Sequence, residues 1–583
     1  MTEDPTTNPS IAAIAAFHAD YESRAGKYRP NGLRVGVKLL AECTVAGIVE
    51  PLRYFCRNCG LDPDIVQLPP YQIEGWLMNA DRDDRQVSAT NVVVISDFEK
   101  LVGSQVVEPN EEQRQQFFTR LRARLQLCDT FRSRTGDHVI VSSLFSSLPG
   151  VNDTYAHVGS FGRNSFLLDA NASLLAECHS RRLEVLPFHD VLARWGHDRC
   201  VSPKHYLSDD SPFSAEGANR VAHALARQIV ATCLPRKKAL VVDLDGTLWQ
   251  GVLGELGPSG VIYKPDSYAG RVYWQILAQL KALAATGIIL AINSKNRQED
   301  VTAILRDREF PLDEEDFAVI RANWLTKDEN MRSIAEELGV GLDRMVMLDD
   351  SAAECLLLRQ RCPEVEVVQV PERLSEYPSR LAAIEGFDRP YLTEGDRIRR
   401  LDYRNAGRRR ELAATSSTLD DFLKALQIRL TLRLAEPVQR GRLSQLFERT
   451  TQFNMTGRRF SEADLARLQD LGSALVSVEY EDCFGSSGVV GAIVAERRAD
   501  TAVITNFVLS CRVLGRCVEN AIIGSIASMW PASPPHRVEF VFEPTSRNAP
   551  ALIFLERIGW ASGTPLQLAD IPVPSVIAVR VES

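Results

Sequence analysis

Short apolar runs alternate with helical patterns along residues 33–233, and this alternation constrains the fold more than any other feature of the chain. Apolar residues at helical spacing cover segments such as 111–127 and 214–233. Strands that alternate with helices favour a mostly parallel sheet covered on both faces. The pattern therefore predicts an α/β domain. Its strand-like runs are LRVGVKLL (33–40), DIVQL (64–68), NVVVIS (91–96), DHVIVSS (137–143) and LEVLP (183–187).

A second series of the same kind begins after Pro235-Arg236-Lys237-Lys238 and ends near residue 385. Helical segments separate its strands, and Gly339 follows the segment 329–338 in the position where glycine commonly ends a helix. This series predicts a second doubly wound, Rossmann-like α/β domain. Its strand-like runs are ALVVDL (239–244), GIILAIN (287–293), FAVIR (317–321), RMVMLD (344–349) and VEVVQV (365–370).

The last third of the chain has a different pattern. Residues 390–425 are polar and arginine-rich, which fits either an anion- or partner-binding surface or a solvated helical connector. From about residue 426 the pattern becomes mixed α and β. A chain of 583 residues is too long for one core, so we predict a multidomain α/β protein. The predicted segments are 1–234, 235–388, 389–425 and 426–583.

The bulk charge excludes some classes of partner. The net charge is −9, which favours neither nucleic acid nor an anionic membrane. No apolar run reaches about 18 residues, and the polar start lacks the features of a secretory signal. Twelve scattered cysteines favour a reducing, cytoplasmic location. Cys56 and Cys59 have the spacing of half a zinc site, but no second pair follows, so we expect ordinary thiols.

The stretch Asp243-Leu244-Asp245-Gly246-Thr247 follows the first strand of the second domain. Ligands of parallel sheets collect at the carboxyl ends of the strands. Two carboxylates two residues apart can approach one phosphorus atom, the first as nucleophile and the second as acid and base. The stretch therefore predicts phosphoryl chemistry with Asp243 and Asp245 as the catalytic residues.

Three further elements follow in chain order. Ser294 ends a strand and can donate to a phosphoryl oxygen, and Lys327 precedes a helix and can neutralise phosphate. Asp349 and Asp350 end another strand, where carboxylates can hold Mg²⁺, a cation that prefers hard oxygen ligands. The intervals between these elements leave no room for a large cap domain beyond the loop 249–260. We therefore expect an open site that can admit a substrate on a long arm or on a protein.

This order of elements resembles the haloacid dehalogenase superfamily of phosphatases and phosphotransferases. Longer sequence stretches resemble the FkbH-like members of this superfamily, which belong to polyketide and related pathways. These stretches are DLDGTLWQGVLGE, SKN, RANWLTKDENMRSIAEELGVGLDRMVMLDDS, TQFNMTGRRF and LSCRVLGRCVEN. The resemblance implies an enzyme that dephosphorylates 1,3-bisphosphoglycerate and delivers a glyceryl unit to the phosphopantetheine thiol of an acyl carrier protein. It implies that one set of residues contacts phosphate or orders the site, and that another set holds Mg²⁺. The first set is Thr247, Ser294, Lys295, Asn296, Lys327 and Asn330, and the second is Asp243, Asp245, Asp349 and Asp350.

One position departs from the family pattern. Relatives often carry cysteine directly before Ser-Lys-Asn, where a thiol can hold the glyceryl group as a thioester, and this chain has Asn293. An amide cannot form that intermediate. Either the acyl group moves directly to its acceptor, or another cysteine serves, or the reaction is a different one. The nominal replacements are Cys355, Cys511 and Cys517.

The flanking domains resemble other families. The N-terminal domain is similar to SGNH hydrolases, but Ala41-Glu42-Cys43-Thr44 offers no serine after the first strand, and the segment 208–217 lacks the expected histidine. We therefore expect a non-hydrolytic docking or positioning module. The C-terminal domain resembles GNAT acyltransferases, which implies a pantetheine or coenzyme A contact near Arg512, Gly515 and Arg516. Cys517 stands where that family has a small residue.

The sequence thus predicts a Mg²⁺-dependent, FkbH-like enzyme that dephosphorylates an acyl phosphate and passes a glyceryl unit to an acyl carrier protein in natural-product biosynthesis. Two alternatives stay open. The first is a phosphatase or phosphoryl transferase that forms no acyl-enzyme. The second is a non-catalytic scaffold that binds a carrier protein.

Overall fold

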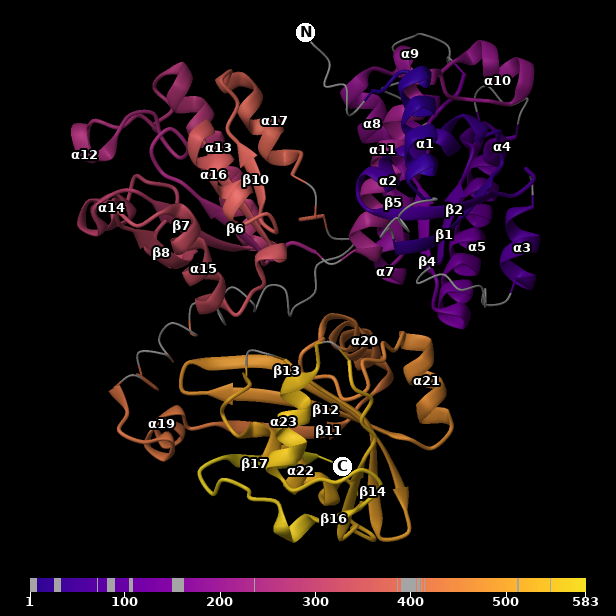
Figure 1. The fold of residues 1–583 in the computed structure, drawn as a ribbon. Coiled ribbons are helices and arrows are strands. Elements are labelled where there is room, and N and C mark those ends of the chain that lie inside the picture. The colour runs from indigo at the N-terminus through magenta and orange to yellow at the C-terminus, as the bar shows by residue number, and fades with distance from the viewer. Residues whose placement is uncertain are drawn as a thin grey trace. The chain divides into compact units, whose positions relative to one another are not determined.

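The computed structural model describes residues 8–25, 33–70, 72–80, 90–103, 109–148, 162–234, 236–384, 386–388, 405, 409, 412–413, 415–510, 513–545 and 547–582. The contacts divide the chain into two compact units, residues 1–236 with 388–391 and residues 237–387 with 392–583 (Figure 1). The further boundaries predicted at 388/389 and 425/426 stay a prediction. In the parts of the chain that are described, no helix is both long and apolar enough to cross a membrane.

The first unit contains a five-stranded parallel sheet in the order β2-β1-β3-β4-β5. One core packs α2 and α11 on one face, and a second core packs α3, α5 and α7 on the other. The strands are β1 (Leu33–Ala41), β2 (Leu61–Gln67), β3 (Thr90–Ile95), β4 (His138–Ser142) and β5 (Glu184–Leu186). The helices are α1 (Ile11–Ala25), α2 (Val49–Asn58), α3 (Ile73–Asn79), α4 (Phe98–Val102), α5 (Glu111–Thr135), α7 (Arg163–Arg181), α8 (Phe188–Trp195), α9 (His197–Cys200), α10 (Pro203–Asp209) and α11 (Ala215–Cys233).

The second unit begins with another five-stranded parallel sheet, in the order β10-β9-β6-β7-β8. Helices α13, α14 and α17 cover one face, and α15 and α16 cover the other. The strands are β6 (Ala239–Val242), β7 (Ile289–Ser294), β8 (Phe317–Ala322), β9 (Met345–Asp349) and β10 (Glu366–Gln369). The helices are α12 (Leu253–Leu256), α13 (Tyr268–Ala285), α14 (Gln298–Leu305), α15 (Lys327–Leu338), α16 (Ala352–Arg361) and α17 (Tyr377–Ala382).

The strand order of this sheet reverses at β6, which has β7 on one side and β9 on the other. Connections that leave in opposite directions open a crevice at the carboxyl ends of such strands. Between β6 and α13 the chain makes only a short excursion with the one-turn helix α12. The predicted absence of a large cap within this sheet's connections is therefore confirmed.

A seven-stranded mixed sheet follows, in the order β16-β15-β14-β13-β12-β11-β17. Strands β11 to β14 are antiparallel neighbours, while β14 with β15 and β11 with β17 are parallel pairs. The strands are β11 (Arg429–Leu434), β12 (Ala474–Asp482), β13 (Gly485–Arg498), β14 (Thr501–Leu509), β15 (Arg537–Phe540), β16 (Leu566–Gln567) and β17 (Ala578–Glu582). The helices are α19 (Leu419–Leu426), α20 (Arg440–Arg449), α21 (Glu462–Asp470), α22 (Val518–Gly524) and α23 (Ala549–Arg557). The predicted mixed α/β, multidomain architecture is confirmed at this level.

The arginine-rich segment 390–425 lies largely outside the described residues, and Arg404, Arg408 and Arg410 fall there. Arg409 is described, and it is neither solvated nor available to a partner. Its guanidinium donates to both carboxylate oxygens of Asp482, at 2.6 and 2.9 Å, and both side chains are buried. The guanidinium holds the pKa of Asp482 below its usual value, although burial acts to raise it. For this arginine, both readings of the sequence were wrong.

Candidate active site

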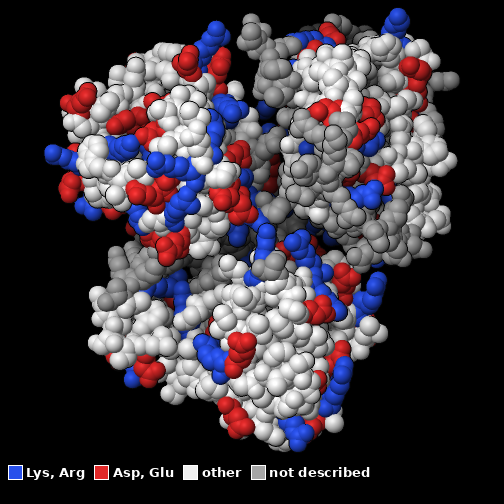
Figure 2. Space-filling model, in the orientation of Figure 1, with Lys and Arg blue, Asp and Glu red and all other residues white. Residues whose placement is uncertain are grey.

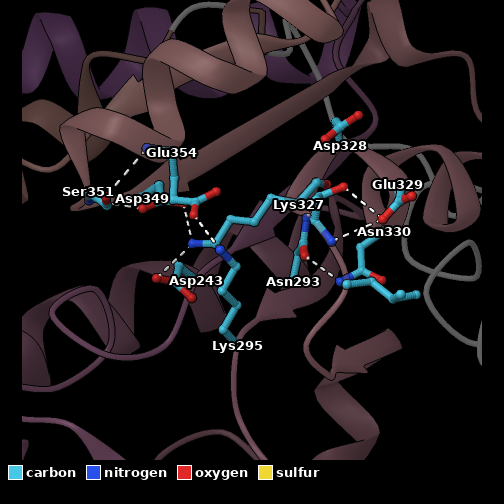
Figure 3. A network of polar contacts seen from close by, with 12 residues as sticks. Asp243, Asn293, Lys295, Lys327, Asp328, Glu329, Asn330, Asp349, Ser351 and Glu354 are labelled. Carbon is cyan, nitrogen blue, oxygen red and sulfur yellow. Dashed lines mark hydrogen bonds and ion pairs between the residues drawn. The ribbon is translucent and has the colours of Figure 1, made fainter.

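Polar side chains from the ends of β7 and β9, from the residues that directly follow β6 and β9, and from the start of α15 meet at the carboxyl edge of the β6–β10 sheet. Figure 3 shows Asp243, Lys327 and Asp349 of this group. Asp243 follows β6, and Asp350 follows β9, which ends at Asp349. Ser294 ends β7, and Lys327 is the first residue of α15. Except for Asp350, these residues are buried, so their charges interact strongly. The structure therefore brings together the four sequence elements that predicted phosphoryl chemistry.

The Lys327 ammonium bridges two carboxylates of this group. Its Nζ lies 2.9 Å from Asp243 Oδ2 and also contacts Asp349 Oδ2. Burial alone lowers the pKa of Lys327, but the two carboxylates outweigh it and raise that pKa above its ordinary value. The ammonium is therefore charged and can offset the charge of a phosphoryl group.

Asp350 forms a group of three carboxylates with the two that contact this ammonium. One oxygen each of Asp243, Asp349 and Asp350 lies within 4.8 Å of the others. Burial raises the pKa of each, and in each case a neighbouring carboxylate adds to the rise while Lys327 opposes it. A divalent cation would replace the lost hydration of these groups. Hard oxygen donors are the ones that Mg²⁺ prefers, so the donor set fits this ion.

The Asp245 carboxylate does not belong to this cluster. Its Oδ1 accepts from Trp249 Nε1 at 2.8 Å and from the Leu253 amide at 2.9 Å. Its Oδ2 accepts from Asn296 Nδ2 at 3.0 Å. Three donors therefore orient this carboxylate, and it is not part of the group formed by the three clustered aspartates. Its role as a metal ligand stays a prediction.

Of the residues predicted to bind phosphate, some lie beside Asp243 and others point elsewhere. The Ser294 hydroxyl contacts the Asp243 carboxylate and accepts from Asn296 Nδ2 at 3.1 Å, so both residues lie at the nucleophile. The Thr247 hydroxyl is buried without a hydrogen-bond partner in the described structure. Lys295 instead points to Glu354, at 2.6 Å, with its side chain 43% exposed. Its role as a phosphate contact stays a prediction.

Asn293 is fully buried and its amide is paired at both ends. Nδ2 donates to the Lys327 carbonyl at 2.9 Å, and Oδ1 accepts from Asn330 Nδ2 at 3.1 Å. Adjacent side chains of a strand point to opposite faces, so Asn293 faces α15 whereas Ser294 faces Asp243. Asn330, predicted to contact phosphate or to order the site, is engaged in ordering it.

The described cysteines that could replace the family cysteine at position 293 are poorly suited to form a thioester. The Cys355 thiol is buried and donates to the Asp349 carbonyl at 3.6 Å, and burial raises its pKa to about 11. Burial also raises the pKa of Cys517, which precedes α22. Thiols with raised pKa values are weak nucleophiles near neutral pH. Cys511 lies outside the described residues.

Three contributors to the site were not predicted. Trp249 holds Asp245, and Asn323 exchanges hydrogen bonds with Asn330. Gly246 has φ +71°, and a Cβ there would lie 2.3 Å from Asp350 Oδ2. Of these three, only the glycine gives a signal in the sequence, as the middle residue of Asp245-Gly246-Thr247 after a strand.

In the first unit, Glu42 takes the place after β1 where a hydrolase of the resembled family would need its serine. Arg124 donates to both of its carboxylate oxygens at 2.8 Å, and the Asp97 amide donates to it at 3.0 Å. Elsewhere, His189 Nδ1 lies 2.9 Å from the hydroxyl of Ser143, which is fully buried. The buried pairing of Glu42 with Arg124 supports the non-hydrolytic role, which stays a prediction.

In the seven-stranded sheet, β14 and β15 part after Ile504. Residues 453–455 fill the gap, because the Met455 amide donates to Phe507 and the Glu543 amide donates to Met455. These backbone groups are therefore not available to an extended pantetheine arm. The Arg516 guanidinium donates to Tyr480 Oη at 2.8 Å, and Gly515 has φ +78°. Arg512 lies outside the described residues, so the pantetheine contact stays a prediction.

Comparisons with known proteins show a likeness of fold. No family model and no curated protein matches the chain. Among solved structures, it is similar to the N-terminal part of the protein BF1531 from Bacteroides fragilis, which contains a phosphatase domain and was crystallised in complex with Mg. The identity is 22% and the TM-score 0.55, over 63% of this chain and 98% of that one.

This likeness shows a similar α/β fold over that part of the chain, and at 22% identity it shows the fold alone. A second match, tagatose-6-phosphate ketose/aldose isomerase from Escherichia coli, has 10% identity and a TM-score of 0.12 over 68% of this chain and 90% of that one. At that score it carries no argument. The FkbH-like, SGNH-like and GNAT-like resemblances stay predictions.

Proposed function

We propose that this chain is a Mg²⁺-dependent phosphoryl-transfer enzyme with Asp243 as its nucleophile. The observation that carries the proposal is the meeting of Asp243, Asp349 and Asp350 with the Lys327 ammonium at the carboxyl edge of one sheet. Such a group can offset the charges of a phosphate and a cation together. The phosphatase domain and the Mg of the similar BF1531 fragment support the same chemistry here.

In the proposed reaction, an Asp243 oxygen attacks phosphorus as the bond to the leaving oxygen breaks, which forms an aspartyl phosphate. Asp245 acts as the acid that protonates the leaving oxygen and then as the base that takes a proton from the water that releases inorganic phosphate. Ser294 and Lys327 hold the phosphoryl oxygens. Asp243, Asp349 and Asp350 would hold Mg²⁺, which supplies Lewis-acid stabilisation of the phosphoryl charge.

For the substrate we propose 1,3-bisphosphoglycerate or a similar acyl phosphate, on the resemblance to FkbH-like proteins. The ester phosphate and the acyl phosphate of this substrate must be removed by different reactions if the glyceryl unit is to be transferred as an acyl group. Attack of Asp243 on the acyl phosphorus would release a free carboxylate. Attack on the phosphate ester leaves the acyl phosphate intact. A carrier-protein thiolate can then attack the acyl carbon, form a thioester and expel inorganic phosphate.

We propose that this transfer, with an acyl carrier protein as partner, involves no thioester on the enzyme. The buried amide of Asn293 and the buried thiol of Cys355 support this version over a covalent relay. The short excursion between β6 and α13 leaves the crevice without a large cap, which suits a substrate or thiol presented by a protein.

The test incubates the full-length protein with Mg²⁺, 1,3-bisphosphoglycerate and a pantetheinylated carrier. Free phosphate and the mass of the carrier are measured together, with Asp243→Asn and a chelator as controls. We expect phosphate release that needs Mg²⁺ and Asp243, and a carrier that gains one glyceryl mass.

Phosphate release with an unchanged carrier mass would show that the protein is a phosphatase and would contradict the transfer step. No release, with the Asp243→Asn variant behaving like the wild type, would remove both enzyme functions and favour the carrier-binding scaffold. An acyl mass on the enzyme itself would contradict the direct transfer.

A further inference from the structure

Three asparagine side chains form a hydrogen-bonded network beside the Lys327 backbone, with Asn330 at its centre, which we call the amide triad: Asn293, Asn323 and Asn330. Asn330 Nδ2 donates to Asn293 Oδ1 at 3.1 Å and to Asn323 Oδ1 at 3.0 Å. Asn323 Nδ2 donates back to Asn330 Oδ1 at 3.2 Å. Asn293 and Asn330 are buried, so these contacts are shielded from water.

The triad joins three separate parts of the sheet edge. Asn293 is the penultimate residue of β7, Asn323 follows β8, and Asn330 lies in the first turn of α15. The Asn323 amide also donates to the Ser294 carbonyl at 3.1 Å, which ties the two strand ends together. The end of the network on α15 is the Lys327 carbonyl, which accepts from Asn293 Nδ2 at 2.9 Å. Figure 3 shows Asn293 and Asn330 on one side of Lys327 and Asp243 and Asp349 on the other.

We propose that the amide triad is a positioning device, which fixes the backbone of Lys327 so that its ammonium bridges Asp243 and Asp349. The inference rests on the proposed function for its catalytic consequence, but its structural consequence is independent of it. A lysine side chain has many rotamers, and its ammonium stays in one place only if the backbone that carries it is fixed. Misplacing a catalytic group by about 1 Å can cost about 100-fold in rate.

Amides suit this place because each one both donates and accepts. Asn330→Asp keeps the shape of the side chain but replaces its NH₂ by a second oxygen. That oxygen would face the acceptors Asn293 Oδ1 and Asn323 Oδ1. Asn323 Oδ1 keeps the Leu325 amide as a donor at 3.0 Å, whereas the buried Asn293 Oδ1 would be left without one, which is unfavourable. Asn293→Asp likewise removes the donor to the Lys327 carbonyl.

The first unit offers a matched control. Asn171 is also buried, and its amide also pairs at both ends, with the Leu144 amide at 2.8 Å and the Leu144 carbonyl at 2.9 Å. Asn171→Asp therefore makes the same chemical change in the same kind of environment, in the other compact unit. It controls for loss of stability without touching the crevice.

The experiment measures the accessibility of Lys327 directly. Full-length wild-type, Asn330→Asp, Asn293→Asp and Asn171→Asp proteins, free of metal, are reductively methylated, and the labelling rate of Lys327 is read by peptide mass spectrometry. Lys295, 43% exposed, is the internal reference. The kcat and KM for p-nitrophenyl phosphate with Mg²⁺ are measured in parallel.

We expect wild-type Lys327 to label much more slowly than Lys295. In both triad variants its rate relative to Lys295 should rise at least about tenfold, and kcat should fall about 10- to 100-fold with a smaller change in KM. Asn171→Asp should leave both ratios unchanged, even where it lowers the melting temperature.

Unchanged Lys327 labelling in both triad variants would overturn the inference, whatever their stability. An equal rise in Asn171→Asp would also overturn it, because the effect would then be general loosening. A wild type without phosphatase activity would contradict the proposed function alone, since the labelling still decides on the triad.

Discussion

The two oxygens of the Asp245 carboxylate are not equivalent. Oδ1 accepts two N–H donors, from Trp249 and the Leu253 amide, whereas Oδ2 accepts one, from Asn296. A carboxylate oxygen has about two lone pairs to offer, so Oδ1 has no position left for a proton. The proton that the proposed mechanism assigns to Asp245 therefore belongs on Oδ2.

Trp249→Phe tests this arrangement. It removes one donor to Oδ1 and leaves that oxygen free to compete for the proton, so we expect kcat to fall about tenfold with little change in KM. Trp324→Phe is the control, because Trp324 is 74% exposed on the loop after β8. Steady-state kinetics of both variants check the prediction. Equal kcat values in the two variants would show that the indole does not orient the acid.

Asn293→Cys separates direct transfer from a relay through the enzyme. The side chain at this position is fully buried and faces α15, so the introduced thiol should not receive a glyceryl group. It should also lower kcat, since it cannot replace the amide. Intact-protein mass after incubation with 1,3-bisphosphoglycerate reports an adduct. A glyceryl mass that maps to position 293 would restore the covalent relay as a workable route.

At the scale of single elements, the turn after β6 brings the Gly246 backbone close to the Asp350 carboxylate that follows β9. Gly246 adopts φ +71° in this turn, and the Tyr273 hydroxyl donates to its carbonyl at 3.2 Å. Such φ values favour glycine, because other residues are strained there. The close approach of Asp350 adds a second requirement for a residue without a side chain.

Gly246→Ala should therefore weaken Mg²⁺ binding. A Cβ would lie 2.3 Å from Asp350 Oδ2, so this carboxylate must move, and we expect the Mg²⁺ concentration for half-maximal activity to rise about tenfold. The control is Gly339→Ala, because Gly339 has φ +60° but nothing within 4 Å of its Cβ. It carries the backbone strain, about 1 kcal/mol, without the collision. The same Mg²⁺ dependence in both variants would rule out the steric effect.

The elements that carry the site were largely predictable from the sequence. Asp243, Ser294 and Asp349 each end or follow an apolar run, and parallel strands place such ends at one edge. The direction of the Asp245 carboxylate was not predictable, because it depends on donors in an excursion without a periodic pattern. Nor was the burial of Arg409, whose partner Asp482 lies 73 residues away in the sequence.

At the scale of the whole chain, each compact unit has hydrophobic cores of its own, made from its own strands and helices. Units of this kind commonly unfold in separate transitions. On the face drawn in Figure 2, the coloured acidic and basic side chains are interspersed, in keeping with a net charge of only −9. Local buried charges therefore matter more than bulk charge for the pH dependence of stability.

Glu184, on β5 of the first unit, is such a charge. Burial raises its pKa from about 4.5 to about 8, although Arg236 acts in the opposite direction. Between these two pH values the Glu184 carboxyl binds more protons in the folded state than in the unfolded state, so its contribution to stability falls as pH rises. Burial lowers the pKa of the neighbouring His138 to about 4, so that group acts in the opposite direction below about pH 6.5. Each pKa unit corresponds to about 1.4 kcal/mol, so the loss is on the order of a few kcal/mol across this window.

Calorimetry of the full-length protein at pH 5.5 and pH 8.5 tests this effect in the presence and absence of Mg²⁺. We expect the transition of the first unit to shift down by several degrees at the higher pH, and Glu184→Gln to reduce this shift, because the amide has no proton to lose. The exposed Glu111 provides the control, Glu111→Gln, which should retain the full shift. Mg²⁺ should raise only the transition of the unit that holds Asp243, because a ligand stabilises the unit it binds. If Glu184→Gln keeps the wild-type pH dependence, this buried carboxyl is not its source.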